Sequence, residues 1–122
     1  MSEEQIKKGY KVLRKKKEIL LSATNMGSVT EYSLTDKTYP PEQCGPLCVF
    51  DNVKDAETLA YHTLFPTFGP YCIYSCTYHS SPKSIIWYMS KGMGYSTDSK
   101  KLPQGTQLAE WIQLEKEEVT TP

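Results

Sequence analysis

The chain has 122 residues, with 14 basic and 14 acidic side chains and therefore no formal net charge. This length supports one small domain, expected to span residues 1–122 with a frayed start at 1–8. The longest apolar run, 85–89, is far shorter than the roughly 20 residues of a membrane-spanning helix. The first residues lack the apolar stretch of a signal peptide, so the sequence predicts a cytoplasmic protein with no membrane partner. The balanced charge argues against general nucleic-acid binding.

The charge is unevenly distributed along the chain. Residues 1–17 carry seven basic and two acidic side chains, a net charge of +5, and the remainder carries −5. The most acidic part is the C-terminal end, and residues 115–122 are expected to form a charged, frayed tail. Pairing of the basic start with the acidic end, a solvated surface, or a basic patch for an anionic ligand would each account for this distribution.

The amino-terminal half reads as a series of strands. Residues 10–14, 18–23 and 29–34 alternate or combine apolar and β-favouring residues, which predicts three strands with polar turns between them. Residues 47–50 are continuously apolar, a pattern typical of a strand that is buried on both faces.

One helix is expected, at about residues 53–64. Its apolar residues recur at intervals of three and four, which places them on a single face. Asp51 or Asn52 can act as the N-cap, and Asp55 lies in the first turn, where a carboxylate suits the helix dipole. Proline and glycine follow the helix and end it.

The carboxy-terminal half returns to strands. Residues 71–78 are rich in aromatic and β-favouring residues and predict a strong strand, and 85–89 predict another. Residues 91–103 are expected to be irregular, with a last strand at 111–114. The order of strands, one helix and strands indicates the α+β class: one mainly antiparallel β-sheet packed against a single main helix.

The four cysteines are spaced as two C-x3-C pairs, which raises the question of a zinc site. Cys72 and Cys76 fall on one predicted strand, where four residues separate them by roughly 13 Å. A tetrahedral zinc needs each sulfur about 2.3 Å from the metal, so one strand cannot supply both ligands. We therefore expect free thiols, no metal and no cofactor.

Catalytic groups are scarce in the sequence. The only histidines are His62, on the predicted helix, and His79, in a polar turn. Neither lies in a nucleophile motif, no carboxylate pair has a spacing that suggests acid–base catalysis, and there is no phosphate-binding glycine motif. The sequence favours a protein that is not an enzyme, with no catalytic residue.

The best candidate for a binding site is the segment 91–97. Its two glycines allow a ligand to approach the backbone closely, and successive N–H groups can form an anion-binding concavity. A lysine and hydroxyls could contact a phosphate, nearby tyrosines could stack on a base, and the only arginine could form a fork to a phosphate. The expected ligand-binding residues are Lys91, Gly92, Gly94, Tyr95, Ser96, Thr97, Tyr88 and Arg14.

Three further segments carry a resemblance. They are GPLCVF at 45–50 with Asp55 and Ala56 behind it, YSCTY at 74–78, and LPQGTQLA at 102–109. Their order resembles small proteins encoded by bacteriophages and bacteria, over about two thirds of the chain. By class, the chain resembles phage anti-defence proteins such as the Thoeris anti-defence proteins, which oligomerise and sequester cyclic nucleotide signals without cleaving them. The motifs themselves are structural, and none is a catalytic signature.

The resemblance implies a phage-type antagonist of host immunity that sequesters a small anionic, nucleotide-like molecule. We expect a homo-oligomer, located in the host cytoplasm if the chain is phage-encoded. Two alternatives stay open: an inhibitor that blocks a host protein, and a small enzyme acting on a nucleotide through His79 or a loop tyrosine.

Overall fold

The computed structural model describes residues 6–16, 19–22, 30–41, 44–60, 71–90, 93–102 and 104–120. These form a six-stranded antiparallel sheet in the order β3-β2-β1-β4-β8-β5, together with a separate two-stranded hairpin. The strands of the larger sheet are β1 (Ile6–Lys16), β2 (Ile19–Ser22), β3 (Glu31–Tyr32), β4 (Leu47–Phe50), β5 (Tyr71–Ser80) and β8 (Thr106–Thr120).

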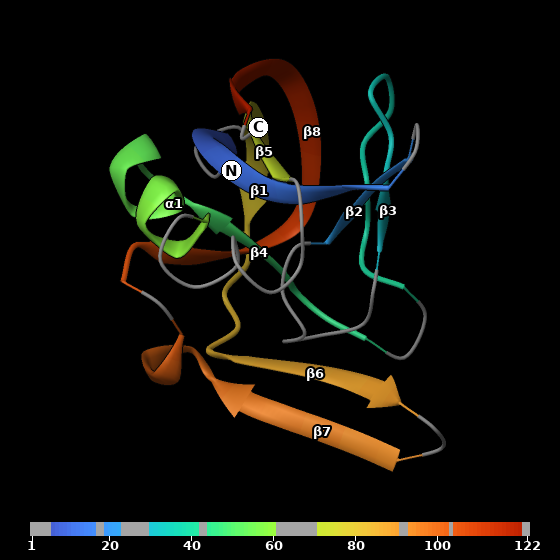
Figure 1. The fold of residues 1–122 in the computed structure, drawn as a ribbon. Helices are drawn as coiled ribbons and strands as arrows, with labels where there is room; N and C mark the ends of the chain where they lie inside the picture. Colours follow the sequence, from blue (N-terminus) through green and yellow to red (C-terminus); the bar gives the residue numbers. More distant parts are fainter. Residues whose placement is uncertain are drawn as a thin grey trace.

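The larger sheet closes on itself, because β5 pairs with β1 as well as with β8 (Figure 1). The β1–β5 ladder is continuous from Ile6↔His79 to Arg14↔Tyr71, but β1 meets β4 at the single pair Tyr10↔Phe50. The strands β1, β4, β8 and β5 thus enclose a small barrel, and β2 and β3 extend from β1. Closure hides strand edges that would otherwise be open to pairing with other chains.

Side-chain alternation divides the core into two parts. One face of the strands points into the barrel and carries residues such as Leu13, Val49 and Ile112. The other face of β1 and β5 supplies Val12, Ile73 and their neighbours to a second cluster under the helix. Period-two alternation therefore places apolar residues on both faces of the barrel wall beside the helix.

The structure contains the first part of the predicted helix. α1 spans Val53–Leu59, and Asn52 caps it by accepting a hydrogen bond from the Asp55 N–H at 2.8 Å. Residues 61–64 of the expected helix lie outside the described residues. With seven residues the helix buries little more than Ala56 and Leu59 against the sheet. The architecture is α+β, but the description as one sheet packed on a single main helix overstates the helix, since the barrel encloses a core of its own.

Residues 91–103 were expected to be irregular, and most of this segment instead forms regular structure. β6 (Ile85–Ser90) pairs with β7 (Met93–Asp98) as a hairpin, and a 3-10 turn at Ser99–Lys101 leads back to the barrel. The hairpin projects from the barrel as a separate sheet (Figure 1). The expectation failed because glycine and hydroxyl residues have a low preference for strands. The backbone hydrogen bonds between β7 and the apolar strand β6 stabilise the extended conformation instead.

The last strand is also longer than expected. β8 runs for 15 residues, from Thr106 to Thr120, so most of the predicted tail at 115–122 belongs to a strand. Glu117 of this strand binds Lys15 of β1 at 3.0 Å and lies 3.4 Å from the Tyr74 hydroxyl. The basic start and the acidic end of the chain therefore pair, at least through this contact.

Candidate functional site

A β-bulge brings three polar or aromatic side chains together on the outside of the barrel. His79 pairs with Trp111, but the next residue of β5, Ser80, pairs with Ala109, so Glu110 is an extra residue in β8. A bulge of this kind lets two successive residues reach one neighbour. The Glu110 carboxylate lies 2.7 Å from His79 Nδ1, and the His79 and Trp111 rings are stacked with centroids 6.1 Å apart. We call His79, Glu110 and Trp111 the bulge cluster.

The segment before β4 packs onto this cluster. Thr38 and Ile112 exchange two backbone hydrogen bonds, of 2.8 and 3.0 Å, which extends the sheet on the edge of β8 opposite β5. This contact places Lys37 Nζ 4.3 Å from the centre of the Trp111 ring, a distance typical of a cation–π interaction. Trp111 is therefore held by both a cation and an imidazole.

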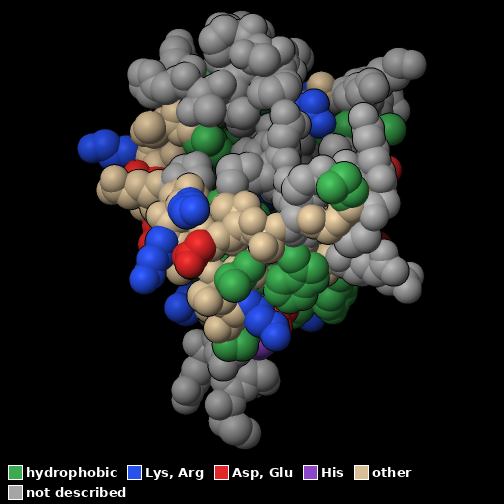
Figure 2. Space-filling model, turned by 90° about the horizontal axis from the view of Figure 1, so that it is seen from below, with side chains coloured by type: hydrophobic (Ala, Val, Ile, Leu, Met, Phe, Trp, Pro, Cys, Tyr) green, Lys and Arg blue, Asp and Glu red, His purple; other side chains and the backbone are tan. Residues whose placement is uncertain are grey.

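Next to the bulge cluster lies an open hollow at the base of the hairpin. Its volume is about 160 Å³, and the residues that line it are Pro40, Gly45, Pro46, Ser81, Lys83, Trp87 and Glu110. Glu110 belongs both to this lining and to the bulge cluster, so the two features share one carboxylate. Figure 2 shows the molecule from the hairpin side, where hydrophobic and lysine side chains lie next to one another. We call this feature the Trp87 hollow.

Trp87 is positioned by a backbone contact with Gly45. The two residues exchange hydrogen bonds of 3.0 Å in both directions. A Cβ atom on residue 45 would lie 2.8 Å from the Trp87 ring, so the absence of a side chain lets the ring cover this backbone. The ring stays 38% exposed, and Lys83 Nζ lies 5.8 Å from its centre. The hollow thus combines an accessible aromatic surface with a nearby positive charge.

The expected ligand-binding residues fall on different parts of the fold. Gly94, Ser96 and Thr97 lie on β7, where Ser96 is the register partner of Trp87 and Thr97 that of the buried Ile86. The backbones of Tyr88 and Tyr95 are paired in the same hairpin, and their side chains lie outside the described part. Lys91 and Gly92 lie outside it altogether.

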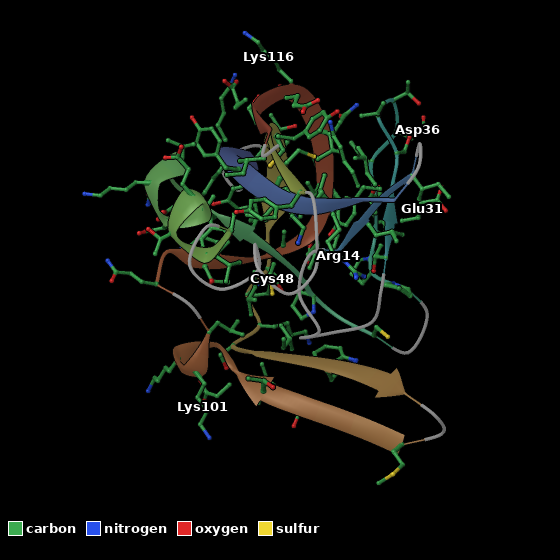
Figure 3. The ribbon with its side chains drawn as sticks, in the orientation of Figure 1. Arg14, Glu31, Asp36, Cys48, Lys101 and Lys116 are labelled. Carbon is green, nitrogen blue, oxygen red and sulfur yellow. The ribbon has the colours of Figure 1, made fainter. Side chains whose placement is uncertain are left out.

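Arg14 does not belong to this part of the molecule. It lies on β1, between Leu21 and Tyr71 of the neighbouring strands, whereas Lys101 lies beside the hairpin (Figure 3). Sequence reasoning also missed Lys83, Trp87 and Glu110. Two of them are near the predicted segment in the sequence, but nothing in the sequence signals the bulge that adds Glu110.

The cysteines are free and mostly shielded from solvent. Burial raises the pKa of Cys72 to about 11 and that of Cys76 to about 12, against 9.0 for an ordinary thiol. Burial also raises the pKa of Cys48, and the nearby Lys11 partly offsets this effect. Because only the thiolate is a strong nucleophile or metal ligand, these three groups are inert near neutral pH. Across the described residues, no three His, Cys, Asp or Glu side chains gather as a metal site.

Comparison of the chain with protein-family models, with curated proteins and with solved structures found no match. Among the described helices, none is long and apolar enough to cross a membrane.

Proposed function

We propose that the protein is a non-catalytic binding protein that sequesters a small nucleotide-like anion at the Trp87 hollow. The observation that carries this proposal is the partly exposed Trp87 ring, which forms a wall of the hollow with Lys83 beside it. Aromatic faces bind bases by stacking, and a lysine attracts a phosphate. The proposed site thus includes the hairpin face on which Ser96 lies opposite Trp87.

The volume of the hollow limits the size of the chemical group that can bind inside it. A cavity of about 150 Å³ holds one benzene molecule, so a hollow of about 160 Å³ accommodates a single aromatic ring. The charged part of the ligand would then lie outside the hollow, next to Lys83. A ligand with one base and one or two phosphates fits this division better than a large apolar molecule.

Two polar side chains in the hollow can orient the ring. The Ser81 hydroxyl can donate or accept, and the Glu110 carboxylate accepts hydrogen bonds from the amino or imino groups of a base. The Glu110 carboxylate lies 2.7 Å from His79 Nδ1, and this contact limits the orientations of the acceptor. Preorganised polar groups increase affinity because less side-chain freedom is lost on binding.

Binding without turnover is favoured because the described residues near the hollow include no activated nucleophile. Cys48, Cys72 and Cys76 are kept protonated by burial. The His79 Nδ1 atom faces a carboxylate, and the described residues of the hollow offer Ser81 as the one hydroxyl group. An enzyme would need a base within hydrogen-bonding distance of that hydroxyl.

The proposal is tested by capture and release. The protein is incubated with a panel of mononucleotides, cyclic mononucleotides, cyclic dinucleotides and cyclic ADP-ribose, separated from free ligand, denatured, and the released compound is identified by mass spectrometry. Intact ligand supports sequestration. A chemically altered compound would instead identify an enzyme, and no retained compound would leave inhibition of a partner protein as the function.

Variants localise the site. Trp87→Ala is expected to lower the affinity at least about fivefold, because stacking on an aromatic ring contributes about 1–3 kcal/mol per base. Trp87→Phe retains part of the affinity. Lys83→Ala weakens binding and reduces its salt dependence, whereas Lys54→Ala, an exposed lysine on α1, is the matched control and leaves binding unchanged. Wild-type affinity in Trp87→Ala excludes the hollow.

The setting in which sequestration acts is part of the proposal. A phage-type antagonist would protect an infecting phage from a host defence that signals through the captured nucleotide. Expression of the protein in defended host cells is expected to restore phage growth, and expression of Trp87→Ala is not.

A further inference from the structure

We infer that two copies of this chain associate through the free edge of β7, which joins their hairpins into one four-stranded antiparallel sheet. The inference concerns the hairpin edge and does not depend on the ligand proposed above. It follows from the direction of the backbone groups on β7, from the short length or charge of the other open edges among the described strands, and from the composition of β7.

The direction of the backbone groups follows from the contacts of Trp87. Its N–H and C=O both bond to Gly45, on the side of β6 that faces away from β7. The pair Trp87↔Ser96 is therefore a non-hydrogen-bonded pair of the β6–β7 ladder. In such a pair the backbone N–H and C=O of both residues point away from the partner strand. The N–H and C=O of Ser96, and by the same alternation those of Gly94, thus point out of the hairpin.

Among the described strands, the other open edges are short or charged. The end strand of the larger sheet, β3, has only two residues. Beyond Ile112, β8 pairs only with β5, but this stretch carries charged side chains, which protect an edge: Glu115, Lys116, Glu117 and Glu118. In the described ranges, no backbone hydrogen bond to Gly94 or Ser96 is present. A six-residue strand whose N–H and C=O groups point outward can form hydrogen bonds with the strand of another chain.

The strand carries none of the devices that protect an edge. Proteins that remain monomeric blunt exposed strands with lysine, with proline or with short length. β7 has the sequence MGYSTD, which contains neither lysine nor proline. Its only charge, Asp98, lies at the strand end and accepts a hydrogen bond from the Lys100 N–H at 2.9 Å. The middle of the edge is therefore uncharged, and Gly94 and Ser96 are exposed there.

A second copy is the occupant that this edge fits. In an antiparallel pair related by a two-fold axis, Gly94 of one copy lies opposite Ser96 of the other, and the outward groups of both residues find partners at once. No like charges from the two β7 strands meet in this register, because Asp98 of each copy lies beyond the paired residues. A two-stranded hairpin is marginally stable alone, and pairing would give each hairpin the third and fourth strands that stabilise a sheet.

The experiment measures mass in solution without ligand. By light scattering after gel filtration, over a wide range of protein concentration, the wild-type chain is expected to approach twice its 13.9 kDa monomer mass. Ser96→Pro and Gly94→Pro each remove one outward N–H, and proline is tolerated on strand edges, so both variants are expected to lose the dimer and halve the mass. Ser96→Ala keeps the N–H and is expected to remain dimeric.

Folding of the proline variants is checked by circular dichroism and thermal unfolding, and a third variant, Ser96→Lys, places a charge on the edge without removing the N–H. Loss of the dimer in Ser96→Lys with an unchanged spectrum supports the inference even if the proline variants fold poorly. A wild-type chain that stays at 13.9 kDa at every concentration overturns it, and so does a dimer that persists in folded Ser96→Pro and Ser96→Lys. Failure of dimerisation leaves ligand capture by the hollow untouched.

Discussion

Glu110 reaches His79 because β8 carries one residue more than β5 at this point of their ladder. The carboxylate and the imidazole Nδ1 lie 2.7 Å apart, although the Glu110 side chain is 49% exposed. Even between two full charges, an exposed contact of this kind contributes no more than about 1 kcal/mol to stability. The contact therefore adds little to stability, and the bulge places a carboxylate at the rim of the Trp87 hollow.

Glu110→Ala is accordingly expected to separate binding from stability. The free energy of unfolding, measured by urea denaturation, should change by less than about 1 kcal/mol. Affinity for the captured nucleotide should fall roughly tenfold or more, the loss of about one hydrogen bond to a charged acceptor. Glu115→Ala, an exposed glutamate farther along β8, is the matched control and should change neither quantity. A large loss of stability in Glu110→Ala would mean that the bulge holds the barrel together.

Gly9 is expected to be essential for closing the barrel. A Cβ atom at this position would lie 2.6 Å from the Phe50 carbonyl oxygen and 2.8 Å from the Tyr78 ring. One of these contacts is with backbone, at the only register pair between β1 and β4, so neither strand can shift freely. Gly9→Ala should lower the free energy of unfolding by about 1–3 kcal/mol, the usual cost of overpacking.

The measurement is urea denaturation followed by circular dichroism. Lys8→Ala changes the exposed neighbouring residue on the same strand and should leave the midpoint near that of the wild type. Equal midpoints for Gly9→Ala and wild type would contradict the close approach of β1 to β4.

The buried thiols predict a loss of stability in alkali. Burial raises the pKa of Cys72 to about 11 and that of Cys76 to about 12, whereas the unfolded thiols ionise near 9.0. Above pH 9 the native state therefore holds protons that the unfolded state has released, and the free energy of unfolding falls as pH rises. Each thiol contributes about 1.4 kcal/mol per pH unit up to its native pKa. Cys76→Ala should reduce this slope, and Cys44→Ala, which alters a partly exposed cysteine, should retain it. An unchanged slope in Cys76→Ala would contradict the burial of this thiol.

Most strands could be predicted from the sequence because apolar and polar residues alternate along a strand that has one buried face. Residues 10–14, 47–50, 71–78 and 111–114 all lie within observed strands. The predicted helix is confirmed over residues 53–59, but its weight in the fold was overstated, because the apolar pattern of the helix does not show that the barrel has a core of its own. β7 was missed because Gly94 and its hydroxyl neighbours have weak strand preference, and the backbone pairing with β6 decides their conformation.

The candidate site depends on contacts that no local pattern contains. Trp87 meets Gly45 across 42 positions of the chain, and Lys37 meets Trp111 across 74. His79 and the segment containing Gly94 and Ser96 could be singled out from residue type alone. Their relation to the hollow could not, because it depends on a bulge in β8 and on the absence of a side chain at Gly45.

Lys11 lies where the barrel has its least backbone pairing, between β1 and β4; we call this the β1–β4 seam. β1 and β4 share only one register pair, and next to it the Lys11 ammonium donates to the Cys48 carbonyl oxygen at 2.6 Å and lies 5.3 Å from the centre of the Tyr32 ring. Desolvation by burial lowers the pKa of Lys11 below 10.5, and the nearby Cys48 and Cys76 offset only part of this effect. The charged form of the Lys11 amine is therefore less stable in the folded protein than in water.

Lys11→Met tests this directly. Between the lowered native pKa and 10.5, the unfolded chain holds a proton that the native amine has released, so this residue makes the wild type more stable as pH rises. The difference in free energy of unfolding, wild type minus Lys11→Met, should therefore increase with pH by up to about 1.4 kcal/mol per pH unit in that interval. Urea denaturation at a series of pH values up to 10.5 measures it. Lys8→Met, on an exposed position of the same strand, should show a constant difference. A constant difference for Lys11→Met as well would mean that water reaches the amine and that the seam is open at this point.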